Sequence, residues 1–190
     1  MKGYWVGAAL TFAIVTASEP AHACMIFGGL DLNDIHYADV VVIGRISNYK
    51  IVIDTVVRQK RKEMLASSPD MPVELRKILT EQTVFLSDYA RFDVQVDEVL
   101  VGKAPKTLSV TWDNSTFGEP EKLSAGPFLI ALRDPSSGLP PLRGPSATIL
   151  SNPEPGSLTV LQAPCSKAFI FENSGEKADA VRQILGARSK

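Results

Sequence analysis

Three short segments in which apolar and polar residues alternate constrain the fold of this chain more than any other feature. In residues 92–101 (FDVQVDEVLV), Phe92, Val94 and Val96 point to one side and their polar neighbours to the other. Residues 107–112 (TLSVTW) alternate again. Because Gly and Pro separate the two segments, they predict an antiparallel hairpin across residues 102–105.

The third segment, residues 38–49 (ADVVVIGRISNY), begins with an unbroken β-branched run and then alternates. This pattern predicts a strand that starts buried and ends at the surface. Gly44 inside it predicts a bend or bulge, a feature of strands that curl into small barrels. We expect the core to include Val41, Ile43, Phe92, Val94, Val96, Val110 and Leu129.

The remaining segments predict a mainly β fold with two helices. Residues 127–132, 147–150 and 158–162 predict further short strands. Residues 69–82 and 175–188 have apolar residues at helical spacing, and Asp70 and Pro72 are placed to start the first of these helices. Residues 51–90 therefore form a partly helical insertion between strands, and the C-terminal helix lies beside a small antiparallel barrel.

Charge gives little indication of a partner. The chain has 20 Lys and Arg residues against 21 Asp and Glu, so nothing in its overall charge suggests binding to nucleic acid. The basic run at residues 58–62 (RQKRK) has two interpretations, an anion-binding patch or an ordinary solvated helix face. The lack of interleaved aromatic residues favours the solvated face.

The N-terminus predicts export. Residues 1–23 combine a positive start, a short apolar stretch and the small residues Ala21 and Ala23, the pattern of a signal peptide. The stretch is too short for a membrane anchor, and no later segment is long and apolar enough to span a membrane. We therefore expect a periplasmic or secreted protein that consists of residues 24–190 as a single domain. Ala21 and His22 disfavour a lipid anchor at Cys24.

Two cysteines, Cys24 and Cys165, remain in the exported chain, and they most simply form one structural disulfide. No catalytic constellation is recognisable. His36 is the one histidine after residue 23, too few for a zinc site without other ligands, and the sequence has neither a nucleophile elbow nor a phosphate loop. Asp31, Asn33 and Asp34 lack the pattern of a calcium loop and favour local capping. We expect no enzyme and no cofactor.

The order of these segments resembles the netrin-like domain of tissue inhibitors of metalloproteinases and their bacterial relatives. The resemblance rests on residues 38–46 (ADVVVIGRI), 92–102 (FDVQVDEVLVG), 107–110 (TLSV) and 126–131 (GPFLIA), with Cys165 and Ser166 as the late Cys-Ser pair. It covers roughly residues 24–170 and implies a five-stranded OB-type barrel. It also implies that Cys24 pairs with Cys165.

Two departures from the family bear on function. Its inhibitors begin with Cys-x-Cys, whose first cysteine binds the protease zinc. Here that position falls at His22, inside the predicted signal peptide. The family's middle Cys-Gly is also replaced, by residues 114–118 (NSTFG). We therefore expect an exported, non-enzymatic binding domain whose partner is another protein. The first alternative is a metalloprotease inhibitor that acts through an N-terminal Cys24. The second is an enzyme or a small-ligand binder with a site that the sequence does not reveal.

The expected binding surface joins two segments. One contains Cys24, Met25, Ile26 and Phe27, and the other is the loop from Trp112 through Asn114 to Phe117. A disulfide at Cys24 would hold the apolar residues beside it rigid, which lowers the entropy lost on binding. The alternative for Met25, Ile26 and Phe27 is that they simply cover the barrel.

Overall fold

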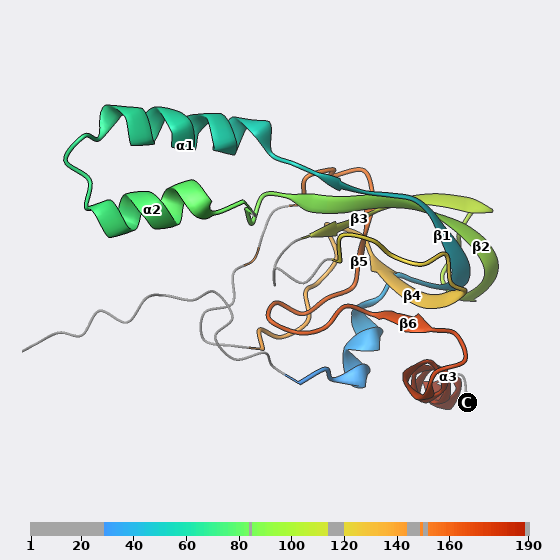
Figure 1. The fold of residues 1–190 in the computed structure, drawn as a ribbon. Helices are drawn as coiled ribbons and strands as arrows, with labels where there is room; N and C mark the ends of the chain where they lie inside the picture. The colour runs from blue at the N-terminus through green and yellow to red at the C-terminus, as the bar shows by residue number, and fades with distance from the viewer. Residues whose placement is uncertain (1–28, 84, 114–119, 144–148, 150–151, 189–190) are drawn as a thin grey trace, which may run out of the picture.

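The computed structural model describes residues 29–83, 85–113, 120–143, 149 and 152–188, and it shows a closed five-stranded barrel with one extra strand (Figure 1). The strands are β1 (Val40–Val52), β2 (Tyr89–Val101), β3 (Thr107–Asp113), β4 (Phe128–Arg133), β5 (Leu158–Val160) and β6 (Ile170–Glu172). They are ordered β1-β2-β3-β5-β4, and β4 pairs back onto β1 to close the barrel. All pairs are antiparallel except β3 with β5. The predicted mainly β, OB-type barrel is confirmed.

Strand β1 is bent so that it can pair on both sides. Its first residues pair with β4, and its whole length follows β2. A register shift falls between Ile43 and Gly44, where the bend was predicted. A Cβ atom at Gly44 would lie 2.6 Å from the carbonyl oxygen of Gln95, which is closer than any side chain permits. Glycine is therefore required here for the two strands to approach.

The predicted hairpin of β2 and β3 is confirmed, but its link is longer than residues 102–105. Pairing between the two strands stops at Gln95 and Thr107, and β2 continues beside β1 up to Val101. The chain then reverses at Gly102, whose φ of 76° is a conformation that glycine adopts readily.

One hydrophobic core fills the interior of the barrel, and a second lies against the outer face of β4. Inside lie the inward residues of β1 to β4, among them Val42, Phe92, Val94, Val110 and Ile130. Strand β4 is buried on both faces because its outward residues, Leu129 and Ala131, are covered by the second core. This two-sided burial explains why both β4 and the start of β1 read as unbroken apolar runs. Of the seven predicted core residues, all are buried except Val96, which packs against the core while partly exposed.

The second core is formed with the 3-10 helix η1 (Leu32–Tyr37) and the helix α3 (Glu176–Arg188). Ile35 of η1 and Ala178 and Val181 of α3 lie against the outer face of β4. The C-terminal helix was predicted within one residue of its observed start. Neither η1 nor β6 was predicted, because each is only a few residues long.

The insertion is a pair of helices, α1 (Thr55–Ser67) and α2 (Val73–Glu81), that extends away from the barrel (Figure 1). The expected helix at residues 69–82 is therefore shorter at its N-terminus. Asp70 does not cap it, because the helix starts after Pro72, and no side chain caps that end. None of the described helices is long and apolar enough to cross a membrane. The strand predicted at residues 147–150 falls, apart from Ile149, outside the described residues.

Candidate binding site

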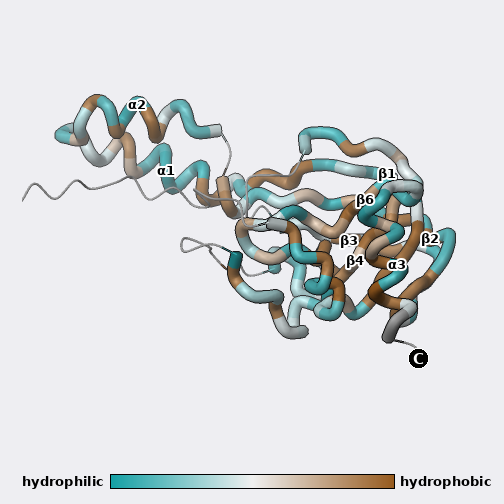
Figure 2. The backbone as a smooth tube through the Cα atoms, turned by 90° about the horizontal axis from the view of Figure 1, so that it is seen from below, coloured by the Kyte–Doolittle hydropathy of each residue, from teal (hydrophilic) through white to brown (hydrophobic). Residues whose placement is uncertain are grey.

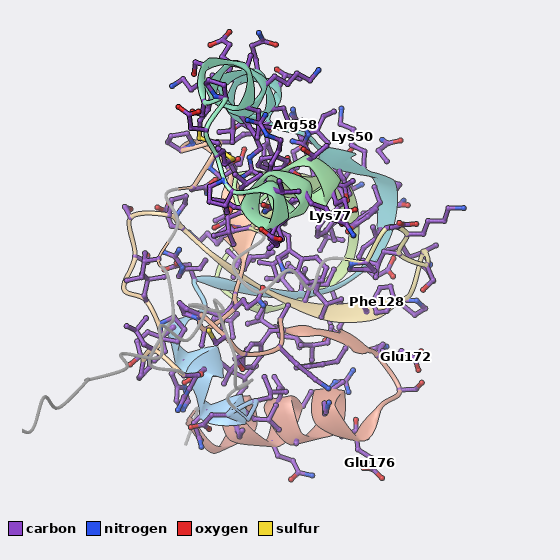
Figure 3. The ribbon with its side chains drawn as sticks, turned by 60° about the vertical axis from the view of Figure 1, so that its left-hand side comes forward. Lys50, Arg58, Lys77, Phe128, Glu172 and Glu176 are labelled. Atoms are coloured by element: carbon purple, nitrogen blue, oxygen red, sulfur yellow. The ribbon has the colours of Figure 1, made fainter. Side chains whose placement is uncertain are left out.

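A pocket opens at the end of the barrel where β3 and β5 finish and β4 begins. It has a volume of about 460 Å³. Its walls are mainly apolar and come from the strands, from the turn before β6 and from the start of α3. The apolar lining residues include Trp112, Leu123, Phe128, Ile170 and Phe171. The polar ones are Gln162, Ser166, Lys167 and Lys177. Figure 3 shows Phe128 on β4 near Glu172 of the paired strand β6.

Trp112 forms part of the inner wall because it follows the inward alternation of Val110 on β3. Its side chain is 8% exposed. The indole Nε1 donates a hydrogen bond to Oε1 of Gln162 at 2.7 Å, and Nε2 of Gln162 donates to the carbonyl of Ser166 at 2.7 Å. These two bonds join the end of β3 to the turn after β5. The wall of the pocket is therefore fixed before any ligand arrives.

The exposed part of the pocket is positively charged. Lys167 and Lys177 are exposed and line it, and the ammonium of Lys177 lies 5.9 Å from the ring centre of Phe171. Among the residues that the structure describes, no carboxylate forms an ion pair with either lysine. An apolar cavity with two available ammonium groups suits an apolar group that carries a negative charge.

Asp113, which follows Trp112, has an unusual carboxyl group. Burial raises its pKa to about 6, although the positive charge of Arg133 acts in the opposite direction. Its Oδ1 atom is buried and has no hydrogen-bond partner among the described residues. Because successive residues of a strand point to opposite faces, this carboxyl lies on the other side of β3 from the indole of Trp112. The buried carboxyl of Asp113 therefore destabilises the folded chain when it is ionised, and it does not line the pocket.

In a second hollow, over the outer face of β1 to β3, three of the polar side chains are hydrogen-bonded to one another. It is lined by Asn48, Tyr49, Lys50, Arg91, Phe92, Asp93 and Ser109. Asn48 and Ser109 donate to the two oxygens of Asp93 at 2.7 and 2.6 Å, and these bonds hold the pKa of Asp93 below its ordinary value. Asn48, with φ of 54°, lies in the irregular stretch of β1. This arrangement fixes a bulge and leaves few groups for a ligand.

Asp31 caps η1, as expected, whereas the ion pairs of Asp31 and Asp34 with Arg143 were not predicted. Asp31 accepts a hydrogen bond from the backbone N–H of Asn33, and this bond is the main reason that its pKa is lowered. Asp34 is buried and accepts from Arg143 at 2.5 Å. Among the described residues, no group of three or more His, Cys, Asp or Glu side chains could hold a metal ion.

The basic run at residues 58–62 is neither simply an anion-binding patch nor simply a solvated helix face, because its arginines hold the insertion in place. Arg58 forms an ion pair with Asp88, and the guanidinium groups of Arg58 and Arg61 lie 4.5 and 4.4 Å from the ring centre of Phe85. Figure 3 shows Arg58 in the helical insertion. Gln59, Lys60 and Lys62 of the run are exposed, as expected of a solvated helix face.

Most of the predicted binding surface lies outside the described residues. This applies to Cys24, Met25, Ile26, Phe27, Asn114 and Phe117. The contiguous surface, the inhibitor alternative and the disulfide of Cys24 with Cys165 therefore stay predictions. Two predicted residues are described: Trp112 lines the pocket, and Cys165 is fully buried immediately before Ser166 of the pocket wall.

The other pocket residues were not found from the sequence. Phe128 was recognisable as part of a strand, but nothing in the sequence shows that its ring faces a cavity. Phe171 and Lys177 come together only because β6 pairs with β4 and leads directly into α3. A three-residue strand gives too little pattern to be recognised.

Comparison with known proteins identifies no relative: no protein-family model matches the chain, and no curated protein or solved structure is significantly similar to it.

Proposed function

We propose that this chain is an exported, periplasmic or secreted, non-enzymatic binding domain. In this proposal it holds a segment of a partner protein in the pocket at the end of its barrel. The observation that carries the proposal is the combination of Trp112 in an apolar wall with Lys167 and Lys177 at the opening. Aromatic side chains in preformed pockets supply most of the binding energy at protein interfaces, and nearby charges give specificity.

The polar groups of the pocket favour binding over catalysis. Ser166 is the only hydroxyl among the described lining residues, and its Oγ has no hydrogen-bond partner that would act as a base. A serine nucleophile requires such a base within hydrogen-bond reach. The amide of Gln162 is engaged at both ends by structural hydrogen bonds.

The netrin-like resemblance supports the same proposal. The segments that carry it fall in β1, β2, β3 and β4, in the order that an OB-type barrel requires. In barrels of this size side chains fill the interior, so ligands bind at the ends, the loops or an outer face.

The charge and the apolar walls define the segment that would be bound: an apolar side chain next to a carboxylate. Selection of displayed random peptides against the exported chain should enrich Phe, Leu or Trp beside Asp or Glu. The doubly reversed variant Lys167→Glu with Lys177→Glu should bind the enriched peptides about tenfold more weakly. The matched control is Lys103→Glu with Lys106→Glu, which changes the net charge equally at residues outside the pocket. Equal binding by the two double variants would reject the pocket as the site.

A further inference from the structure

The helices α1 and α2 expose an unusual amount of apolar surface. Neither helix contains a buried residue. Of the eleven exposed large apolar side chains in the described part of the chain, seven lie between residues 51 and 78: Ile51, Ile53, Val56, Met64, Val73, Leu75 and Ile78. Figure 2 shows hydrophobic stretches in this pair of helices, which extends away from the barrel. Patches of this kind on a soluble protein mark interaction surfaces.

Arginine contacts, rather than an apolar core, hold the two helices together. Arg76 of α2 donates to the carbonyl of Leu65 at 2.9 Å and also to that of Ser68, and Arg61 of α1 donates to Oε1 of Gln82 at 2.6 Å. Where the two helices join the barrel, Arg58 forms an ion pair with Asp88, whose side chain is 5% exposed. The helices therefore have a defined position, while five of their apolar residues stay exposed to solvent: Val56, Met64, Val73, Leu75 and Ile78.

The exposed residues lie on the stripes by which the helices would pack. On α1, Met64 falls on the same face as Val57 and Leu65, and on α2, Ile78 falls beside Leu75. Ile78 is 63% exposed and Leu75 is 44% exposed. Helices of thirteen and nine residues are too short to be stable alone in water. Further helices packed on this open face would supply the missing burial.

The charges of the pair point to a second copy of the same surface. Helix α1 has four basic residues and one acidic, whereas the rest of residues 54–82 has four acidic and two basic. Lys60 of α1, one turn before Met64, is exposed, as are Glu74 and Glu81 of α2, one turn to either side of Ile78. A two-fold arrangement that lays α1 of one copy against α2 of the other brings opposite charges together. An anionic membrane would gain little from a segment whose charges nearly balance.

We propose that this helical pair is a homodimerisation element: two copies pack through Met64, Leu75 and Ile78 into an antiparallel four-helix bundle that leaves the barrel pockets free. Two-fold pairing of one surface with itself is the commonest way in which soluble proteins associate.

Sedimentation equilibrium of the purified exported chain, at about 5 to 200 µM, tests the dimer. Wild type should dimerise within this range, and Ile78→Glu should raise the dissociation constant at least about tenfold. Leu142→Glu is the matched control, because Leu142 is 53% exposed but lies outside the helical pair. It should dimerise like wild type. Since Ile78 is exposed, its variant should also keep the circular dichroism of the wild type.

Charge exchange tests the α1-to-α2 pairing. The variant Lys60→Glu and the variant Glu74→Lys should each dimerise weakly, because like charges then face each other. An equimolar mixture should form heterodimers as strong as wild type, since each α1 then meets a complementary α2. A monomeric wild type over the whole range, equal effects of the Ile78 and Leu142 variants, or binding to anionic vesicles without dimerisation would overturn the proposal.

Discussion

Single side chains in the interior determine most of the stability of this barrel, and Phe92 is the clearest case. It is 1% exposed and packs in the inner core with Tyr49, whose ring centre lies 5.8 Å away. Phe92→Ala should lower the free energy of unfolding by about 3–5 kcal/mol, because it removes buried area and leaves a cavity. Urea denaturation measures this. A loss below about half a kcal/mol would mean that the assigned strand face is wrong.

Asp113 should make stability depend on pH in the direction opposite to that of most carboxyl groups. Its pKa is about 6 in the folded chain, above the ordinary value of 3.8 for an aspartate. The stability that this raised pKa contributes is present below pH 3.8 and is lost as the pH rises through 6. Asp113→Asn, which cannot ionise, should therefore stabilise the chain at pH 7.5 by roughly 1–3 kcal/mol.

The comparison of urea midpoints for wild type and Asp113→Asn at pH 4 and pH 7.5 checks this. The advantage of the variant should nearly vanish at the lower pH. An advantage of equal size at both values would show that ionisation of this carboxyl is not its cause.

Among the elements, the helical pair depends on its attachment to β2. Asp88 accepts hydrogen bonds from Arg58 and from the backbone N–H groups of Asp54 and Phe85. Burial raises the pKa of Asp88, but these bonds outweigh burial and hold it below the ordinary value. This stabilisation is therefore present above the ordinary pKa of an aspartate and is lost as the pH falls.

Removal of Arg58 should loosen the helical pair before the barrel. Arg58→Ala should cost about 1–3 kcal/mol, because the ion pair is partly buried and Asp88 keeps its backbone donors. Hydrogen exchange should accelerate in residues 55–81 more than in β1 to β4. Lys62→Ala, at an exposed position one turn further along α1, should change neither quantity. Equal acceleration in residues 55–81 and in β1 to β4 would contradict a local role for the Arg58–Asp88 ion pair.

Elements were predictable where the pattern is long. The alternation in residues 92–101 and 107–112 predicted β2 and β3, and Gly44 predicted the bend of β1. Both predictions are confirmed. Helix α1 was anticipated only as part of an insertion, because Arg58 and Arg61 occupy the face where apolar residues would have revealed a helix. The pocket depends on pairing between β4 and β6, and no local pattern contains that information.

At the scale of the whole molecule, the predicted disulfide of Cys24 with Cys165 would join the N-terminal segment to the turn beside the pocket. A loop of about 140 residues closed in this way stabilises by roughly 4–5 kcal/mol in the chain-entropy model. The oxidised, exported chain should show no thiol that reacts under denaturing conditions, and Cys165→Ala should lower the free energy of unfolding by a few kcal/mol. Two reactive thiols would reject the bridge.

The fluorescence of Trp112 tests most directly whether the pocket at the end of the barrel binds an apolar anion. Trp5 lies in the predicted signal peptide, so Trp112 is the one tryptophan in residues 24–190. Titration with anilinonaphthalene sulfonate, an apolar anion, should quench Trp112 by energy transfer. The variant Lys167→Glu with Lys177→Glu should weaken this binding about tenfold, and Lys103→Glu with Lys106→Glu should leave it unchanged. No energy transfer, or an equal effect of both double variants, would contradict a binding role for this pocket.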